Sequence, residues 1–376
     1  MIEMVKFVDL KRLHSSLVSS FTKTLRRHIL NSNFILGESV QRFEKNFSSY
    51  LGVKYAVGVN SGTDALMISL KSLGLEKGEE VIVPAFTFVS TASSVVLMGG
   101  RPVFCDIEED TLGMDVEDLK KKITSKTKAV ICVHLYGNPC NILEIKRICR
   151  KNKIFLIEDA CQAHGAKVKF RGSFKFVGTF GDCGCFSFYP SKNLGALADG
   201  GMLVSSKKSI YKKALILRDC GRISKNVFLH PGFNTRLSSI QASFLDIKLR
   251  YLDEWNRRRK KIAGWYKQLL EDVPQVKIVP EEKYGECVYH LIGILTPQRD
   301  ALLEFLKSKG IEVGIHYPFP LHLQPCFKYL NYKKGDFPVS EKIASSILTL
   351  PLHPYLSYKE IKYVCYQIKK FYTSKK

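Results

Sequence analysis

Two apolar runs on either side of an amphipathic stretch decide the fold: Ala129-Val-Ile-Cys-Val133, then Asn141 to Lys153, then Ile154-Phe-Leu-Ile157. Both short runs are uninterrupted, which is typical of strands that are covered on both faces of a sheet. The stretch between them is basic and amphipathic, as expected for a surface helix. A strand, a helix and a strand at this spacing predict a parallel pair within an α/β sheet.

Apolar runs and amphipathic stretches alternate on both sides of this unit. The pattern predicts further strands at residues 55–59, 80–83, 183–188 and 202–205, and a helix at residues 65–75. A helix-rich stretch over residues 237–270 leads into a second region, with a strand predicted at 287–295 and helices at 300–309 and 361–372. We therefore predict an α/β protein with a large, mostly parallel-sheet domain over residues 1–252 and a smaller C-terminal α/β domain over residues 253–376.

The composition excludes several classes of protein. Of the 376 residues, 45% are hydrophobic and 25% charged, which argues against extensive disorder and collagen. No apolar run approaches the roughly 20 residues that cross a bilayer, so we expect no membrane partner. The first ten residues include Glu3 and no apolar core, and we expect no secretory signal and a cytoplasmic location. The eleven cysteines are scattered, without a Cys-x-x-Cys pair, which predicts free thiols and no metal site.

The net charge is unusually positive, because 58 Lys and Arg face 35 Asp and Glu to give +23. Such a charge permits contact with nucleic acid or a membrane surface and favours an anionic substrate. The basic clusters Lys120–Lys122, Arg257–Lys261 and Lys369–Lys376 are spread along the chain, and no RNA- or DNA-binding motif accompanies them. We expect no nucleic-acid partner.

Polar stretches follow several of the predicted strands, where ligands of an open parallel sheet bind. Residues 60–65 read Asn-Ser-Gly-Thr-Asp-Ala and open a helix. Gly62 permits a close approach of the backbone, and the first N–H groups of a helix have no partners of their own, so the stretch can bind a phosphate. Capping of the helix by Ser61 or Thr63 explains the same residues equally well.

Two further stretches carry chemistry. Glu158 and Asp159 end a buried strand and point to opposite faces, so one of them is expected to face a ligand, unless Asp159 caps a helix. Lys192 lies in a tight turn bounded by Pro190 and Gly195, where a fixed lysine can form an imine or carry a proton. A phosphate site, a strand-end carboxylate and a turn lysine, in this order, are what pyridoxal 5′-phosphate (PLP) requires.

The stretch from Phe186 to Gly201 resembles the lysine signature of the DegT-type sugar-nucleotide aminotransferases, which have the fold-type-I, aspartate-aminotransferase-like fold of PLP transferases. Similar segments occur in order over about residues 35–355, so that the resemblance covers most of the chain. These segments are Gly37-Glu38, Asn60–Leu66, Pro84–Phe88, Glu158–Ala166, Gly232–Arg236, Gln241-Ala242, His316–Pro318 and His322–Pro325. The sequence departs from the family's usual wording at Cys161, Ser191 and Ala198.

The resemblance implies a role for each residue of a PLP site. Lys192 is expected to hold PLP as a Schiff base, Asp159 to pair with the pyridinium nitrogen, and Gln162 to bond the ring hydroxyl. The same resemblance assigns the cofactor phosphate to Gly62, Thr63 and Ser187, stacking on the ring to Phe88, and a contact with the neighbouring subunit's phosphate to Asn234. It therefore implies a homodimer with shared active sites. Structural alternatives remain for three of these residues: a core position for Phe88, a locally satisfied strand position for Ser187 and a turn position for Asn234.

The implied reaction is a transamination in which L-glutamate is the donor, pyridoxamine phosphate (PMP) is the intermediate form of the cofactor, and a nucleotide-linked keto-sugar is the acceptor. The wording of the lysine loop is most similar to the branch that acts on 3-keto-6-deoxyhexoses, so we expect a dTDP-linked 3-keto sugar and a product for glycan synthesis, such as lipopolysaccharide O-antigen. A 4-keto-sugar or cyclitol aminotransferase is an alternative. A PLP-dependent sugar dehydratase is another, although relatives of that kind carry histidine in place of the lysine. The candidate substrate contacts are Tyr189, Lys225, His316 and Tyr317, with Lys225 assigned to the diphosphate.

Overall fold

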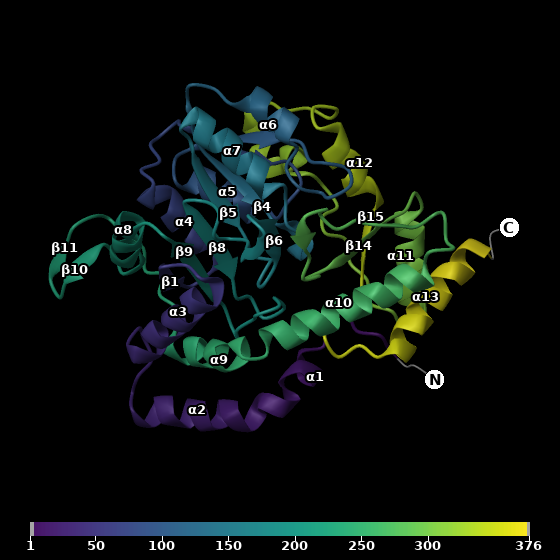
Figure 1. Cartoon of the computed structure of the whole chain (residues 1–376), viewed down its shortest axis with the longest axis horizontal. Helices are drawn as coiled ribbons and strands as arrows, with labels where there is room; N and C mark the ends of the chain where they lie inside the picture. The colour runs from purple at the N-terminus through teal and green to yellow at the C-terminus, as the bar shows by residue number, and fades with distance from the viewer. Residues whose placement is uncertain (1–3, 374–376) are drawn as a thin grey trace.

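The computed structural model describes residues 4–373 (Figure 1). Residues 1–3 and 374–376 lie outside the described part. Part of the N-terminal stretch in which we expect no secretory signal, and the end of the basic run Lys369–Lys376, therefore lie outside it as well. Within residues 4–373, no helix is long and apolar enough to span a bilayer. All eleven cysteines are free, as the sequence predicts.

A seven-stranded sheet in the order β1-β9-β8-β5-β4-β2-β3 is the largest sheet of the described residues. Neighbouring strands from β8 to β3 are parallel, whereas β9 pairs antiparallel with both β1 and β8. The sheet is therefore mostly parallel, as predicted. Its strands are β1 (Tyr55–Val59), β2 (Glu80–Pro84), β3 (Arg101–Cys105), β4 (Thr127–Val133), β5 (Phe155–Asp159), β8 (Cys183–Ser187) and β9 (Gly201–Ser205).

Both faces of this sheet are covered, which explains its uninterrupted apolar strands. In β4, Val130 and Cys132 belong to one core cluster while Ala129 and Ile131 belong to the other, because successive side chains of a strand point to opposite faces. The first cluster includes residues of α3 (Glu38–Leu51), α6 (Val116–Lys122), α7 (Ile142–Asn152) and α9 (Ser239–Leu249). The second includes residues of α4 (Gly62–Ser72), α5 (Ser90–Leu97) and α8 (Lys208–Arg218).

The long helix α10 (Leu252–Leu269) leads from the large sheet to the C-terminal part of the chain (Figure 1). There β12 (Lys277–Ile278), β14 (Ile292–Leu295) and β15 (Ile347–Leu350) form an antiparallel sheet, with α11 (Arg299–Ser308), α12 (Pro338–Ser346) and α13 (Tyr358–Thr373). The division of the chain at residue 252 stays a prediction. Val5 from the N-terminus packs within the core of this C-terminal part.

One predicted strand is wrong over half of its length. Only residues 292–295 of the predicted strand 287–295 pair within the sheet. The preceding residues bond instead to the short turn η2 (Leu135–Gly137): the N–H of Val288 donates to the carbonyl of Gly137 at 3.0 Å, and the N–H of His290 to that of Tyr136 at 2.8 Å. The apolar pattern of this segment therefore reflects a loop that packs against another part of the fold, and not a strand.

The remaining elements are short or lie at the periphery. The N-terminus forms α1 (Leu10–His14), η1 (Ser15–Leu17) and α2 (Val18–Leu30). A hairpin of β10 (Arg222–Ser224) and β11 (Val227–Phe228) protrudes at the left of Figure 1. The others are β6 (Lys167–Phe170), β7 (Ser173–Phe176), β13 (Gly285–Glu286), η3 (Leu321–Leu323) and η4 (Pro325–Leu330).

Candidate active site

A cavity of 510 Å³ lies beyond the carboxyl ends of β1, β2, β5 and β8. Residues of the C-terminal part and of the N-terminal segment complete its wall, among them Leu352 and Val8. Ten of the twelve predicted site residues line this cavity: Gly62, Thr63, Phe88, Asp159, Gln162, Ser187, Tyr189, Lys192, His316 and Tyr317.

The start of α4 forms one end of the cavity. Ser61 caps the helix, since its Oγ accepts the N–H of Asp64 at 3.0 Å, so the capping interpretation is right for this residue. The N–H groups of the first turn have no acceptors within the helix, and the helix dipole adds positive charge there. Capping and anion binding therefore coexist at this helix terminus.

Hydroxyl groups surround the same helix terminus. The hydroxyl of Thr63 donates to that of Ser90 at 2.9 Å, and Ser187 lines the cavity beside them. At Gly62 a Cβ would lie 2.7 Å from Sγ of Cys161 and 2.9 Å from Cβ of Ser187, so no larger residue fits without a shift. Free N–H groups, hydroxyls and a closely approached backbone suit a phosphate group.

The two carboxylates at the end of β5 have separate environments. The Glu158 carboxylate accepts the N–H groups of Gly178, Phe180 and Gly181, each at 2.6 Å, and is fully buried away from the cavity. Asp159 faces the cavity and is followed by a turn, so it does not cap a helix. Glu158 thus organises the loop before β8, and Asp159 is the carboxylate that a ligand meets.

Two hydrogen bonds fix the Asp159 carboxylate. Its Oδ2 accepts the hydroxyl of Thr91 at 2.9 Å, and its Oδ1 accepts the N–H of Cys161 at 3.2 Å. Asp159 is 6% exposed and Thr91 1%, so water competes little for these bonds. A carboxylate held in this way can pair with a protonated ring nitrogen in a fixed direction.

Lys192 lies in the loop after β8, and hydrogen bonds to backbone atoms of this loop hold the loop in place. The N–H of Lys192 donates to the carbonyl of Tyr189 at 2.9 Å, and the carbonyl of Gly195 accepts Nζ of Lys248. Burial lowers the pKa of Lys192 below its usual value, although Cys161 and Asp159 oppose this shift. A lowered pKa increases the neutral fraction of the amine, which is the form that attacks a carbonyl.

Gln162, Tyr317 and Phe88 form the adjoining wall. Oε1 of Gln162 accepts the N–H of Tyr136 at 2.7 Å, and its Nε2 donates to the hydroxyl of Tyr317 at 3.3 Å. Phe88 is 51% exposed, with its ring centroid 5.9 Å from that of Tyr317. The alternative that Phe88 is a core residue is therefore wrong, and a planar ligand can reach its face.

Three histidines close to Lys192 are held neutral. Burial, followed by the charge of Lys192, lowers the pKa of His164 to about 3 and that of His316 to about 4, and it lowers the pKa of His290 well below its usual value. Within residues 4–373, His164 has no partner for either ring nitrogen and His290 none for Nδ1. Of these three, His290 and His316 line the cavity and present neutral polar atoms to it, whereas His164 lies outside the described lining.

Several residues of this site could not be predicted from the sequence. Thr91 and Ser90 follow the expected phenylalanine at position 88, but nothing local distinguishes them from other helix residues. His290 lies in the segment wrongly predicted as a strand, and Phe7 lies far from every motif, so that only folding reveals their place in the wall.

Two predicted residues lie elsewhere. In the described part of the chain, neither Asn234 nor Lys225 lines the cavity. Asn234 is exposed and pairs as a β-bridge with Asp219, and Lys225 is exposed in the turn of the β10–β11 hairpin. Their assigned contacts are therefore not made within one chain.

A second cluster of polar groups lies in the core. Cys132, His134 and Cys140 bring their Sγ and imidazole atoms within 4.8 Å of one another, and all three are buried. Both ring nitrogens of His134 are engaged, Nε2 with Glu158 at 3.1 Å and Nδ1 as acceptor of the Cys140 N–H at 3.2 Å. The absence of a metal stays a prediction for this protein.

Comparison with known proteins agrees with this geometry. The sequence model of the DegT/DnrJ/EryC1/StrS aminotransferase family matches residues 16–369. The chain belongs to this family. Like its relatives, the aminotransferase is a PLP-dependent enzyme that acts on nucleotide-linked sugars, and solved relatives hold the cofactor as PMP or PLP. The residues around the cavity fit the cofactor. One end of the cavity suits its phosphate, and the same cavity holds the fixed carboxylate of Asp159 and the amine of Lys192.

Individual relatives span nearly the whole aminotransferase. It is 39% identical over 372 residues to the "Pleiotropic regulatory protein" of Geobacillus stearothermophilus, covering 98% of each chain. It is 35% identical over 352 residues to the "dTDP-3-amino-3,4,6-trideoxy-alpha-D-glucose transaminase" of Streptomyces venezuelae, covering 94% of this chain and 92% of the relative. The crystal structure of S. venezuelae DesV with a ketimine intermediate superposes with a TM-score of 0.94 at 34% identity, covering 98% of both chains. Other relatives are named for UDP-linked and GDP-linked sugars.

Proposed function

We propose that this aminotransferase transfers the amino group of L-glutamate to C3 of a dTDP-linked 3-keto-6-deoxyhexose. The observation that carries the proposal is the loop from Phe186 to Gly201, whose wording is most similar to that of the 3-keto branch and whose Lys192 faces the cavity together with Asp159. Relatives named for dTDP-3-amino sugars, at 35% and 36% identity, support the choice of nucleotide.

The residues of the cavity have separate roles in the reaction. PLP, when bound, supplies an electron-withdrawing ring that stabilises negative charge at the carbon next to the transferred nitrogen. Asp159, fixed by Thr91, would hold a proton at the ring nitrogen and so strengthen that withdrawal. Lys192, with its lowered pKa, would take the proton from the donor's α-carbon and deliver it to the cofactor carbon that carries the transferred nitrogen.

The acceptor is tested with a panel of keto-sugars. The holoenzyme, L-glutamate and dTDP-, UDP- or GDP-linked 3-keto or 4-keto sugars are combined, and the products are measured by mass spectrometry. We expect a product with an amino group added to the sugar to form fastest from the dTDP-linked 3-keto sugar. Preference for a 4-keto sugar, or for a cyclitol ketone added to the panel, would contradict the proposal, and a deoxygenated product without an added amino group would indicate a dehydratase.

We also propose a homodimer with shared active sites, located in the cytoplasm and supplying amino sugars to a glycan such as O-antigen. Asn234 and Lys225 lie outside the cavity of their own chain, as a role at a partner's site requires. Exposed apolar side chains, which a second copy would cover, lie on α2 and the β10–β11 hairpin and include Val18, Ile29, Leu30, Ile223, Val227 and Phe228.

Mixing two impaired variants tests the shared site. Lys192→Ala and Asn234→Ala are each expected to be impaired, but a hybrid dimer contains one site with both residues intact. Unfolding and refolding the two together should restore about a quarter of the wild-type activity, because half of the dimers are hybrids and half of their sites are complete. No recovery in a sample that elutes as a dimer would contradict the role of Asn234.

A further inference from the structure

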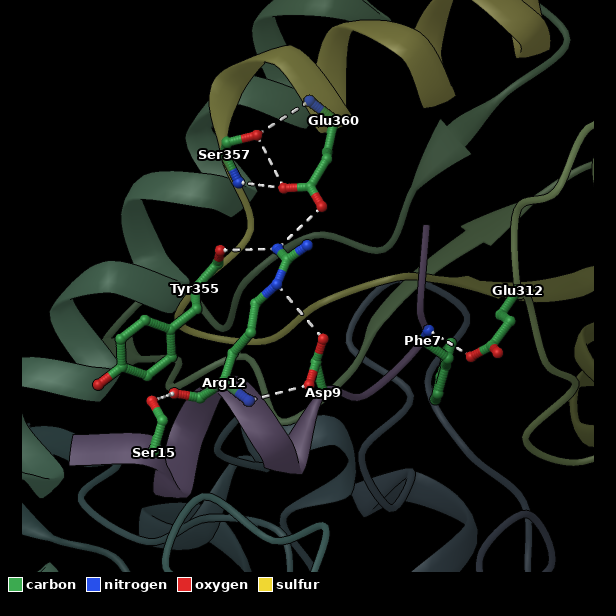
Figure 2. Close-up of polar contacts among 8 residues, drawn as sticks. All are labelled: Phe7, Asp9, Arg12, Ser15, Glu312, Tyr355, Ser357 and Glu360. Atoms are coloured by element: carbon green, nitrogen blue, oxygen red, sulfur yellow. Dashed lines mark hydrogen bonds and ion pairs between the residues drawn. The ribbon is translucent and has the colours of Figure 1, made fainter. Parts of the chain in front are cut away.

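The N-terminal segment Val5–Asp9, here called the strap, is bound to the C-terminal part of the chain. Val5 is fully buried; its N–H donates to the carbonyl of Gly310 at 2.8 Å, and its carbonyl accepts the N–H of Glu312 at 2.9 Å. The N–H of Phe7 donates to Oε2 of Glu312 at 2.8 Å (Figure 2). The strap therefore runs beside residues 310–312 as an added strand would.

A network of charged groups fixes the far end of the strap. Asp9 caps α1 by accepting the N–H of Arg12 at 3.0 Å, and the Arg12 guanidinium lies 3.3 Å from Asp9 and 2.9 Å from Glu360 (Figure 2). The N–H and hydroxyl of Ser357 hold the other oxygen of Glu360 at 2.8 and 2.7 Å. Both carboxylates are largely buried while the Arg12 side chain is 46% exposed, so water screens this anchor less than it screens a fully exposed ion pair.

The strap brings an aromatic ring to the cavity. Phe7 lines the cavity and stacks on His316, with ring centroids 5.6 Å apart and planes at 13°. His316 contacts the ring of Tyr317 at 5.8 Å, and Tyr317 contacts that of Phe88 at 5.9 Å. These four rings form a continuous wall from the N-terminus to the large sheet.

Hydrogen bonds define which atom His316 offers to a ligand. The hydroxyl of Thr349 donates to the carbonyl of Gly314 at 2.9 Å, so its oxygen is left to accept Nδ1–H of His316 at 2.8 Å. The lowered pKa, about 4, keeps the imidazole neutral at pH 7. Nε2 is then a hydrogen-bond acceptor, which a hydroxyl group satisfies and a carboxylate does not.

We propose that Phe7 is a positioning residue for the sugar: the strap holds its ring against His316, so that Nε2 of the imidazole meets a hydroxyl of the keto-sugar. This inference rests on the proposed sugar-nucleotide substrate. The carboxylates of L-glutamate only accept hydrogen bonds and its amino group is the one transferred, so the strap serves the sugar half of the reaction and leaves the donor half unchanged.

The test compares the two half-reactions in four variants. Phe7→Ala removes the ring, Phe7→Leu keeps apolar volume without stacking, Phe7→Tyr keeps the ring, and Lys6→Ala alters the strap beside it. The reverse reaction of the nucleotide-linked amino sugar with 2-oxoglutarate gives the KM for the sugar, and calorimetry gives its Kd. Bleaching of the yellow holoenzyme by L-glutamate in a single turnover reports on the donor half.

For Phe7→Ala and Phe7→Leu we expect the KM and Kd of the amino sugar to rise about three- to tenfold, the range of a lost aromatic pair, with glutamate bleaching within twofold of wild type. Phe7→Tyr and Lys6→Ala should match wild type. An unchanged sugar Kd, or an equal loss in both half-reactions, overturns the proposal. The sugar used in this test is the panel member that the wild type aminates best. Failure with dTDP-linked sugars would therefore contradict the proposed acceptor, and the Phe7 comparison would still decide the role of the strap.

Discussion

Lys192→Ala is expected to lower turnover by roughly 10⁴-fold or more, because it removes both the amine that holds the cofactor and the group that moves the proton. The variant should remain folded, since the loop around residue 192 is held by backbone bonds and by Lys248, which bonds the carbonyl of Gly195. Steady-state rates and a thermal unfolding midpoint within a few degrees of wild type provide the check.

Borohydride reduction locates the amine independently of activity. In the wild-type holoenzyme the label should appear on the peptide that contains Lys192, and in Lys192→Ala this label should be lost. Lys207→Ala is a matched control, because Lys207 is an exposed lysine that pairs with Asp182 at 2.5 Å. Full turnover by Lys192→Ala, or a label on another peptide of the wild type, would refute the assigned role.

Asp159→Asn is expected to lower kcat by about 10³-fold, because losing about three pKa units of support for the ring proton corresponds to ~4 kcal/mol. Asparagine has the same shape and can still accept the N–H of Cys161, so that the fold and the cavity are kept. The measurements are kcat and nitrogen NMR of the ring nitrogen in holoenzyme prepared with labelled cofactor, which should show its proton lost in the variant.

Two neighbouring residues provide controls for Asp159→Asn. Thr91→Val removes one hydrogen bond to the carboxylate and should cost about tenfold or less, while Thr91→Ser should retain wild-type kcat. Glu158→Gln, on the opposite face, should lower the unfolding midpoint because it weakens the bonds to three loop N–H groups. A ring nitrogen that stays protonated in Asp159→Asn would show that another group holds the proton.

The local pattern of the sequence predicted six of the seven strands of the large sheet, but not β3 (Arg101–Cys105). Strands β4 and β5 and helix α7 occur where the apolar runs and the amphipathic stretch predict them, because burial on two faces leaves a signal in each segment separately. The lysine loop, the strand-end Asp159 and the helix start at Gly62 were predictable for a related reason. Each is a short contiguous motif at the end of one strand, and parallel strands bring such ends together.

Only the tertiary structure decided which distant residues complete the wall of the cavity. Phe7 reaches His316 through bonds between the strap and residues 310–312, and His290 reaches the cavity because its loop bonds to the turn at Tyr136. Such contacts join segments that carry no shared periodicity, so their partners cannot be found in either segment alone. The sequence by itself therefore determined most of the sheet, the family and the cofactor chemistry, whereas packing between remote segments decided the shape and polarity of the sugar side.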